Sequence, residues 1–176
     1  MNMNMKRTHV TVVLVVLMSA IALTQNVRYN SMPGTDFSKY HTYKWVSVPG
    51  AQQLNQIQEA ELKQAVDTPL AAKGFTQTTN DNADMYVGYQ VSVGNEKEWN
   101  AYGTGRGWGG GMATATSTTI AVGTVALDFY GPAAKQLIWR GEATKTLNPS
   151  GNQEKNQKNL DKAMQKLLKH FPPGKE

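Results

Sequence analysis

Hydrophobic and polar residues alternate most regularly between Ala83 and Val93. One set of alternate positions is apolar and the other mostly polar: Met85, Val87, Tyr89, Val91 and Val93 against Tyr86, Gln90 and Ser92. Side chains in a strand point to opposite faces with a period of two, so this pattern predicts a half-buried antiparallel strand.

Four further segments have the aromatic and β-branched content of strands, and residues typical of turns separate several of them. The predicted strands are Val27–Tyr29, Tyr40–Val48, Thr114–Tyr130 and Gln136–Leu147. The predicted turns and loops are Met32-Pro33-Gly34-Thr35, Thr76–Asn82, Gly131-Pro132 and Asn148-Pro149-Ser150-Gly151. Short turns between consecutive strands favour antiparallel pairing.

Apolar residues at steps of three and four predict two helices, Ala51–Lys73 and Lys155–His170. The apolar face of the first is Leu54, Ile57, Leu62, Ala65, Val66 and Leu70, and that of the second is Leu160, Ala163, Met164, Leu167, Leu168 and Phe171. Pro69 predicts a kink or a restart of the first helix, and Gly74 its C-terminal cap. The second helix carries lysines on its other face, which we interpret as solvated, with contact to a membrane surface as the alternative.

These elements follow one another in the order β-β-α-β-β-β-α. They predict an α+β fold with a mainly antiparallel sheet and two helices packed on one of its faces. No internal repeat is visible, and no succession of βαβ units supports a doubly wound nucleotide-binding fold.

The start of the chain has the pattern of an export signal. Lys6 and Arg7 precede the apolar run Val10–Leu23, which is shorter than the roughly 20 residues that a membrane-spanning helix needs. We therefore expect residues 1–22 to be a cleaved signal peptide and residues 23–176 to be a single domain in the periplasm or cell envelope. The alternative is an uncleaved leader that anchors the protein in the membrane.

The chain contains no cysteine. A lipid anchor on cysteine, a disulfide, a thiolate metal ligand and a cysteine nucleophile are thereby excluded. The start of translation stays open among Met1, Met3 and Met5.

The net charge of +5 is mild, and the basic residues are spread along the chain rather than clustered. Nucleic-acid binding is therefore not expected. A glycine-rich segment from Tyr102 to Gly111 includes a G-x-G-x-x-G match, but a strand-like sequence follows it instead of a helix, so we interpret it as a hairpin loop. Its functional alternative is contact with a ligand or partner through Tyr102, Arg106 and Trp108.

Little in the chain supports catalysis, a metal site or a cofactor. His41 and His170 lie on different predicted elements without an acidic cluster, and His170 is placed to complement a helix dipole. Asp128 and Glu142 lie on neighbouring predicted strands and could form a carboxylate pair for acid–base chemistry. Surface contacts between Asp128 and Lys145, or between Glu142 and Arg140, are the structural interpretation of the same residues.

Several segments in order resemble a known family. They are Tyr40-His41-Thr42-Tyr43-Lys44-Trp45, Leu70-Ala71-Ala72-Lys73-Gly74-Phe75, Ala83-Asp84-Met85-Tyr86-Val87, Leu137-Ile138-Trp139-Arg140-Gly141-Glu142-Ala143 and Phe171-Pro172-Pro173. Over about residues 27–173 the chain resembles the bacterial envelope proteins grouped as domain of unknown function 4136, often described as lipoproteins. The resemblance implies a periplasmic α+β domain, with Tyr43, Trp45 and Trp139 in the core and Gly141 allowing close packing of helix and sheet. It implies no activity, and this chain lacks the cysteine that carries the lipid in such proteins.

We expect a non-enzymatic accessory or binding domain of the cell envelope, whose partner is an envelope protein, a lipid or a peptidoglycan component. The alternatives are a small envelope hydrolase or transferase that uses Asp128 and Glu142, and a structural envelope-stress protein without a specific ligand.

Overall fold

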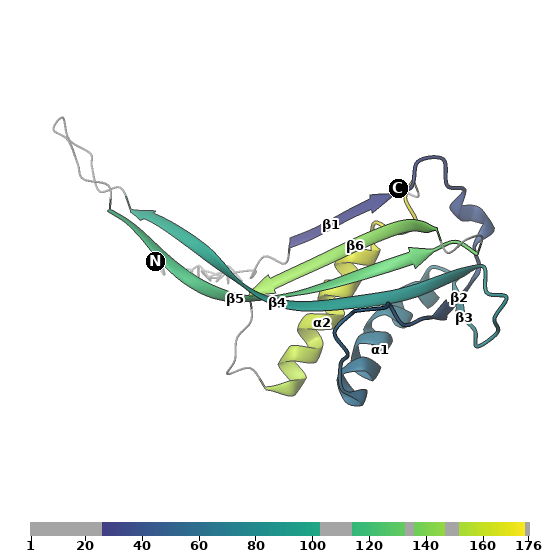
Figure 1. The fold of residues 1–176 in the computed structure, drawn as a ribbon, viewed down its shortest axis with the longest axis horizontal. Helices are drawn as coiled ribbons and strands as arrows, with labels where there is room; N and C mark the ends of the chain where they lie inside the picture. Colours follow the sequence, from purple (N-terminus) through teal and green to yellow (C-terminus); the bar gives the residue numbers. More distant parts are fainter. Residues whose placement is uncertain (1–25, 103–113, 133–135, 147–151, 175–176) are drawn as a thin grey trace, which may run out of the picture.

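The computed structural model describes residues 26–102, 114–132, 136–146 and 152–174. Figure 1 shows the elements in chain order. They are β1 (Asn26–Ser31), a short 3-10 helix (Phe37–Lys39), β2 (Thr42–Trp45), α1 (Gln56–Ala72), β3 (Thr76–Gln77), β4 (Met85–Tyr102), β5 (Thr114–Tyr130), β6 (Leu137–Thr146) and α2 (Gln153–Leu168). The predicted leader, residues 1–22, and the predicted turn Asn148-Pro149-Ser150-Gly151 lie outside these ranges.

The strands form one mixed sheet in the order β1-β6-β5-β4-β2-β3. The four strands β1, β6, β5 and β4 pair antiparallel, as predicted for most of the sheet. β2 runs parallel to β4, and the two-residue β3, in the predicted polar loop, runs parallel to β2. The parallel pairing follows from connectivity, because α1 links β2 to β3 and returns the chain to the end of the sheet at which β2 began.

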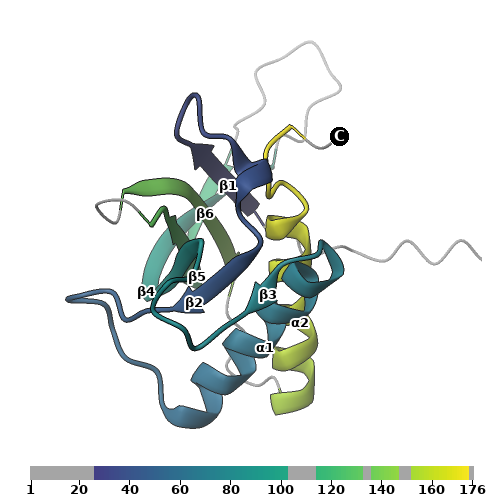
Figure 2. The same cartoon turned by 90° about the vertical axis from the view of Figure 1, so that its right-hand side faces the viewer.

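Both helices cover the same face of the sheet, which confirms the predicted α+β arrangement (Figure 2). The buried residues between the helices and this face form one core, listed here by element. They include Tyr43 of β2, Leu62, Ala65, Val66 and Leu70 of α1, Met85, Val87 and Tyr89 of β4, Leu127 and Phe129 of β5, Trp139 and Ala143 of β6, Ala163, Met164, Leu167 and Leu168 of α2, and Phe171. The alternation along β4 thus places its apolar side chains as predicted up to Tyr89.

The first helix begins later than predicted. Asn55 caps it, and the Asn55 side chain accepts a hydrogen bond from the backbone N–H of Gln58, so residues 51–55 are not helical. Ile57, predicted to face the core, lies in the first turn of the observed helix and is 66% exposed, so that prediction is wrong. The helix runs through Pro69 to Ala72 without a restart.

The predicted cap of this helix is confirmed. Gly74 has φ +89°, a conformation that glycine adopts without strain. The backbone N–H of Gly74 bonds the carbonyl of Ala71, and that of Phe75 bonds the carbonyl of Leu70. This is a Schellman motif, which satisfies the last carbonyls and returns the chain towards β3.

One carboxylate joins β2 to the start of β4. Asp84 Oδ2 accepts hydrogen bonds from the backbone N–H groups of His41 and Thr42 and from the Thr42 hydroxyl, at 2.8–2.9 Å. These bonds, the His41 one first, hold the pKa of Asp84 below its usual value. Asp84 therefore fixes the register at which the parallel edge of the sheet begins.

β4 and β5 extend far beyond the rest of the sheet. They pair continuously from Tyr86 opposite Tyr130 to Tyr102 opposite Thr114, whereas β6 reaches only as far as Val122. We call residues 94–102 and 114–121 the ribbon, and the remainder of the described domain the body; Figure 1 shows the ribbon projecting to the left of the body. The sequence predicted that the first of these strands ends at Val93, so the length of the ribbon was not foreseen.

None of the described helices has the length and apolar character needed to cross a membrane.

Candidate functional site

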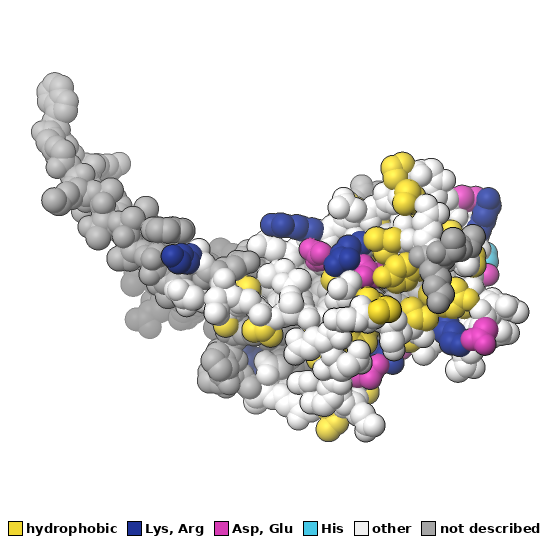
Figure 3. All heavy atoms as spheres, viewed as in Figure 1, with side chains coloured by type: hydrophobic (Ala, Val, Ile, Leu, Met, Phe, Trp, Pro, Cys, Tyr) yellow, Lys and Arg dark blue, Asp and Glu magenta, His cyan; other side chains and the backbone are white. Residues whose placement is uncertain are grey.

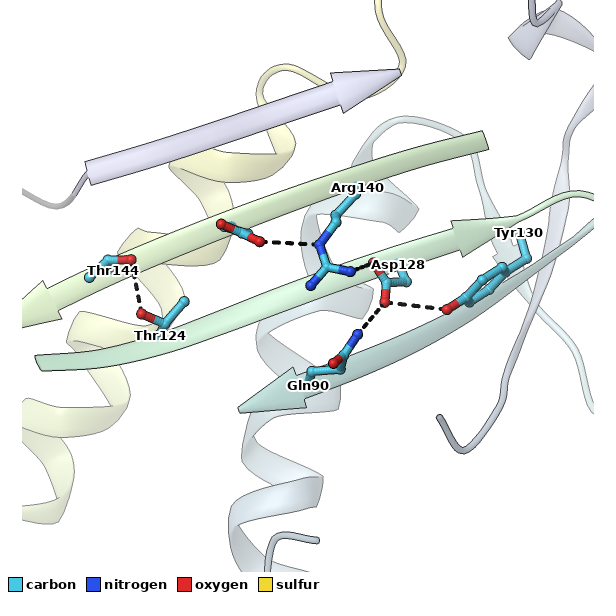
Figure 4. Close-up of polar contacts among 7 residues, drawn as sticks. Gln90, Thr124, Asp128, Tyr130, Arg140 and Thr144 are labelled. Atoms are coloured by element: carbon cyan, nitrogen blue, oxygen red, sulfur yellow. Dashed lines mark hydrogen bonds and ion pairs between the residues drawn. The ribbon is translucent and has the colours of Figure 1, made fainter. Parts of the chain in front are cut away.

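The face of the sheet opposite the helices carries a cluster of polar side chains around Asp128. Register places Asp128 of β5 opposite Arg140 of β6 and Gly88 of β4. Asp128 is only 1% exposed. Figure 4 shows the side chains that converge on it from three strands. A carboxylate buried to this degree is stable only with strong polar partners.

Asp128 has three such partners. Its Oδ2 accepts hydrogen bonds from the Gln90 side-chain amide at 2.7 Å and from the Tyr130 hydroxyl at 3.3 Å. Its Oδ1 lies 3.3 Å from Nη1 of Arg140, an ion-pair distance. This pairing is electrostatic, because Oδ1 receives no hydrogen bond of good geometry in the described structure.

Arg140 connects the two carboxylates that the sequence singled out. Its Nε donates to Oε1 of Glu142 at 3.1 Å, while its Nη1 approaches Asp128 (Figure 4). The predicted contact between Glu142 and Arg140 is therefore confirmed. The predicted contact between Asp128 and Lys145 is wrong, because Arg140 takes that place and Lys145 lies at a β6 position on the other face of the sheet.

The cluster has the features of a structural network. Desolvation, followed by the negative charge of Asp128, raises the pKa of Tyr130, so this phenol stays protonated at neutral pH and donates to the carboxylate. A general acid or base must reach a substrate proton. Asp128 is closed off from solvent and held by three side chains, whereas Glu142 is 39% exposed and paired with Arg140. The geometry gives the carboxylate pair no free reactive group.

The face around this cluster is charged but balanced. Figure 3 shows basic and acidic side chains lying next to each other over the strands. Arg28 of β1 lies opposite Glu142 in the register, which continues the alternation of sign to the edge of the sheet. Thr124 and Thr144 add a hydroxyl pair, 3.0 Å apart, along the same face.

The two histidines of the domain lie apart. His41 directly precedes β2 and is exposed, whereas His170 follows the end of α2 and stacks on Tyr29 of β1, with ring centroids 4.6 Å apart. His170 therefore contacts an aromatic ring of the edge strand. Within the described ranges, no three side chains of the metal-binding types come together.

The predicted contact residues belong to the far end of the ribbon or lie beyond it. Tyr102 is the last residue of β4 and pairs with Thr114. Arg106 and Trp108 lie outside the described residues. The structure thus places Tyr102 at the end of β4 that lies farthest along the strand from the body.

Three contributors to the Asp128 cluster were not recognised as a group in the sequence: Gln90, Tyr130 and Arg140. Gln90 lies at one of the polar positions that alternate with apolar ones along β4. Arg140 follows the apolar residues Leu137, Ile138 and Trp139 of β6. An aspartate in one strand and an arginine opposite it in the next strand would indicate such a cluster. The sequence alone does not show that Asp128 and Arg140 lie opposite each other, because the register depends on how the two strands pair.

Comparison with known proteins identifies the family. The family described as Domain of unknown function (DUF4136) matches residues 25–173. The chain belongs to the DUF4136 family. The positions behind the resemblance have structural roles in this DUF4136 domain, since Tyr43 and Trp139 are buried and Trp45 is partly buried. A Cβ on Gly141 would lie 2.2 Å from the Trp139 ring and 2.9 Å from Leu167 of α2, which confirms the close packing expected there.

Solved structures share the fold at low sequence identity. A PDZ domain protein from Parabacteroides distasonis matches with TM-score 0.58 and 12% identity, covering 86% of this chain but 37% of its own. A DUF4136 family protein from Bacteroides thetaiotaomicron matches with TM-score 0.52 and 12% identity over 84% of this chain and 96% of its own. The PelC dodecamer from Paraburkholderia phytofirmans matches with TM-score 0.50 and 14% identity over 82% and 95%. Among curated proteins no match is found.

Proposed function

We propose that this DUF4136 domain is a non-enzymatic accessory module of the cell envelope that is exported to the periplasm and binds a protein partner through its ribbon. Export is supported by the basic and apolar pattern of residues 1–22, and binding by the shape of the sheet. Membership of the family is compatible with both and supplies no activity of its own.

The ribbon carries the proposal. Beyond Val122 in β5 and beyond Val87 in β4, the described strands pair only with each other. Among the described residues, both edges of the ribbon therefore carry backbone N–H and C=O groups that no other strand pairs, and such edges pair readily with another chain. A two-stranded ribbon is marginally stable by itself in water, so a partner that adds a strand would stabilise it.

Among the three partner classes expected from the sequence, this geometry favours a protein. Lipids and glycans do not offer a row of alternating backbone donors and acceptors, whereas an extended polypeptide does. The structurally similar PelC is described as a dodecamer. Further copies of this chain are accordingly one form that the protein partner could take.

The export part of the proposal is tested by recovering the protein from fractionated cells of the native host and measuring its intact mass. We expect a soluble periplasmic species that lacks residues 1–22. A species that retains these residues in the cytoplasm would contradict export, and one that retains them in the membrane fraction would show an anchor in place of a cleaved signal.

The ribbon part is tested with a shortened variant in which an Asn-Gly turn replaces residues 96–120. A two-residue turn of this kind closes an antiparallel pair, so Asn95 and Ala121 can stay paired and the body is left unchanged. Chemical cross-linking in intact cells should give adducts of higher mass with the full-length protein and none with the shortened one. Lys158→Gln is the control, because Lys158 lies on the outer side of α2 and pairs with Glu154. Identical adducts from the full-length and shortened proteins would rule the ribbon out.

A further inference from the structure

A pocket lies between α2 and the helix-facing side of the sheet, at the end from which the ribbon departs. Its volume is about 600 Å³, within the range of pockets that hold small ligands. Most of its surface is apolar and comes from four elements. The apolar lining is Val91 and Val93 of β4, Ala121 and Val125 of β5, Ala143 of β6, and Leu160, Ala163 and Met164 of α2.

The apolar floor of this pocket is open to solvent. Val93 occupies a helix-facing position of β4 but is 70% exposed, which corrects the prediction that it is buried. The reason is that α2 begins only at Gln153 and covers the sheet no farther than this point. Water-exposed apolar surface of this kind is stabilised by an apolar ligand.

The rim of the pocket is basic. Lys145 of β6 and Lys155 of α2 both line it, and Lys162 lies close enough to act on Lys145. Burial, followed by the positive charges of Lys155 and Lys162, lowers the pKa of Lys145. No acidic side chain in the described part of the chain forms an ion pair with Lys145. The lining of the pocket, as far as the chain is described, contains Lys145 and Lys155 and no carboxylate.

We infer that this pocket binds a single-chain lipid with an anionic head group. The acyl chain lies on the floor formed by Val93, Val125 and Leu160, and the head group meets Lys145 and Lys155 at the rim. The lining contains no aromatic residue on which a base or a sugar ring could stack. The site takes only Ala121 from the ribbon, and the shortened variant, which replaces residues 96–120, keeps that residue. Lipid binding can therefore be tested independently of the proposed partner binding.

Isothermal titration of the full-length protein with dodecanoate, below its micelle concentration, tests the inference. Dodecyltrimethylammonium, which has a chain of the same length and a cationic head group, is the matched ligand. We expect dodecanoate to bind with one site per chain and the cationic ligand to bind at least about tenfold more weakly, since a charge-assisted contact is replaced by repulsion. Equal affinity for both ligands, or no binding of dodecanoate, would overturn the proposal.

Two pairs of variants locate the site. Lys145→Gln should weaken dodecanoate binding by about tenfold, whereas Lys158→Gln, on the outer side of the same layer, should leave it unchanged. Val93→Asp should abolish binding and Ile57→Asp should not. Both residues are similarly exposed, at 70% and 66%. Ile57 lines the neighbouring groove, which shares Val125 and Leu160 with the pocket but contains neither Val93 nor the lysines of the rim.

The same variants separate the lipid from other occupants. Val93 is largely exposed, so Val93→Asp should keep the circular dichroism spectrum and the melting temperature close to those of the parent protein. Dodecanoate binding that survives both Lys145→Gln and Val93→Asp would overturn the proposal. A dimer in the parent protein that Val93→Asp converts to a monomer would overturn it too, in favour of a second copy of the chain in the pocket.

Discussion

β4 and β5 are each one continuous strand, but the body and the ribbon give their two halves different surroundings. In the body, Val87 and Leu127 are fully buried under the helices, and β2 and β6 pair on either side. In the ribbon, the described pairing is only that of β4 with β5. The pairing of β4 with β5 is thus common to both halves, and what distinguishes them is the flanking strands and the layer of helices. We therefore expect burial under the helices, rather than the pairing of β4 with β5, to supply most of the stability of these two strands.

The largest effect on stability is expected when a large apolar side chain is shortened to alanine in the body, compared with the same change in the ribbon. Leu127→Ala should lower the free energy of unfolding by about 4 kcal/mol, because it leaves a cavity in a site that is fully buried. Ile120→Ala, in the ribbon, should lower it by less than about 1 kcal/mol, since Ile120 is only partly covered. Urea denaturation followed by tryptophan fluorescence measures both. Equal losses would contradict the comparison.

A second test of the comparison between body and ribbon adds a side chain in place of a strand glycine in each. Gly141→Val should destabilise the protein by about 3 kcal/mol, because its Cβ would meet the Trp139 ring at 2.2 Å. Gly94→Val should change stability by no more than about 1 kcal/mol, since a Cβ there has only Val122 Cγ2 at 4.0 Å. Thermal melts of the two variants give the difference. A Gly94 variant as unstable as the Gly141 variant would show that the ribbon is packed after all.

The buried aspartate gives a smaller effect, on the face of the body without helices. Asp128→Asn should cost about 2 kcal/mol, because the Arg140 ion pair is lost while Arg140 keeps Glu142 and partial exposure to water. Glu142→Gln, at 39% exposure, should cost less than about 0.5 kcal/mol. Urea denaturation at neutral pH compares the two. If Glu142→Gln had the larger effect, the assignment of Asp128 as the structural centre would be wrong.

The smallest effect concerns pH at the point where the body begins. The pKa of Asp84 is lower in the folded than in the unfolded chain, so the contribution of this carboxylate is present above its unfolded pKa of about 3.9. It is lost as the pH falls through the folded pKa, and the loss amounts to about 1 kcal/mol. Unfolding free energies at about pH 6 and about pH 3 should therefore differ less in Asp84→Asn than in the parent protein. Asp81→Asn is the comparison. The Lys44 hydrogen bond also lowers the pKa of Asp81, but this pair is exposed and screened by solvent, so the pH dependence should change less than in Asp84→Asn. An unchanged pH dependence in Asp84→Asn would contradict this role.

Local patterns in the sequence predicted those elements whose partners lie in the body. The alternation from Met85 to Tyr89 and the apolar spacing of α2 each reflect one buried face, that of the strand against the helices and that of the helix against the sheet. Gly74 predicted its own cap because the left-handed conformation is a local requirement. The ribbon has no comparable pattern. Its described strands pair only with each other, and Gly94, Asn95 and Lys97 are exposed, so nothing there requires apolar and polar residues to alternate.

Features that depend on distant pairing could not be obtained in the same way. The parallel placement of β2 beside β4 depends on Asp84 reaching residues more than forty positions earlier. The position of Arg140 between two carboxylates depends on the register of β5 with β6. The sequence predicts Lys145 as a surface partner of Asp128, but the alternation of side chains along β6 places it on the opposite face, at the rim of the pocket.

The pairing of the edge strand β1 has a consequence for the order in which this protein assembles. Val27 lies opposite Ala143, so the first described strand finds its neighbour only when the last strand of the sheet has been made. Closing a loop of that length is entropically costly and comes late in folding, whereas the neighbouring strands β4, β5 and β6 can pair as soon as they follow one another from the ribosome. In a chain truncated before β6, β1 would lack the strand with which it pairs. β1 can therefore join the sheet only after β6 has been synthesised.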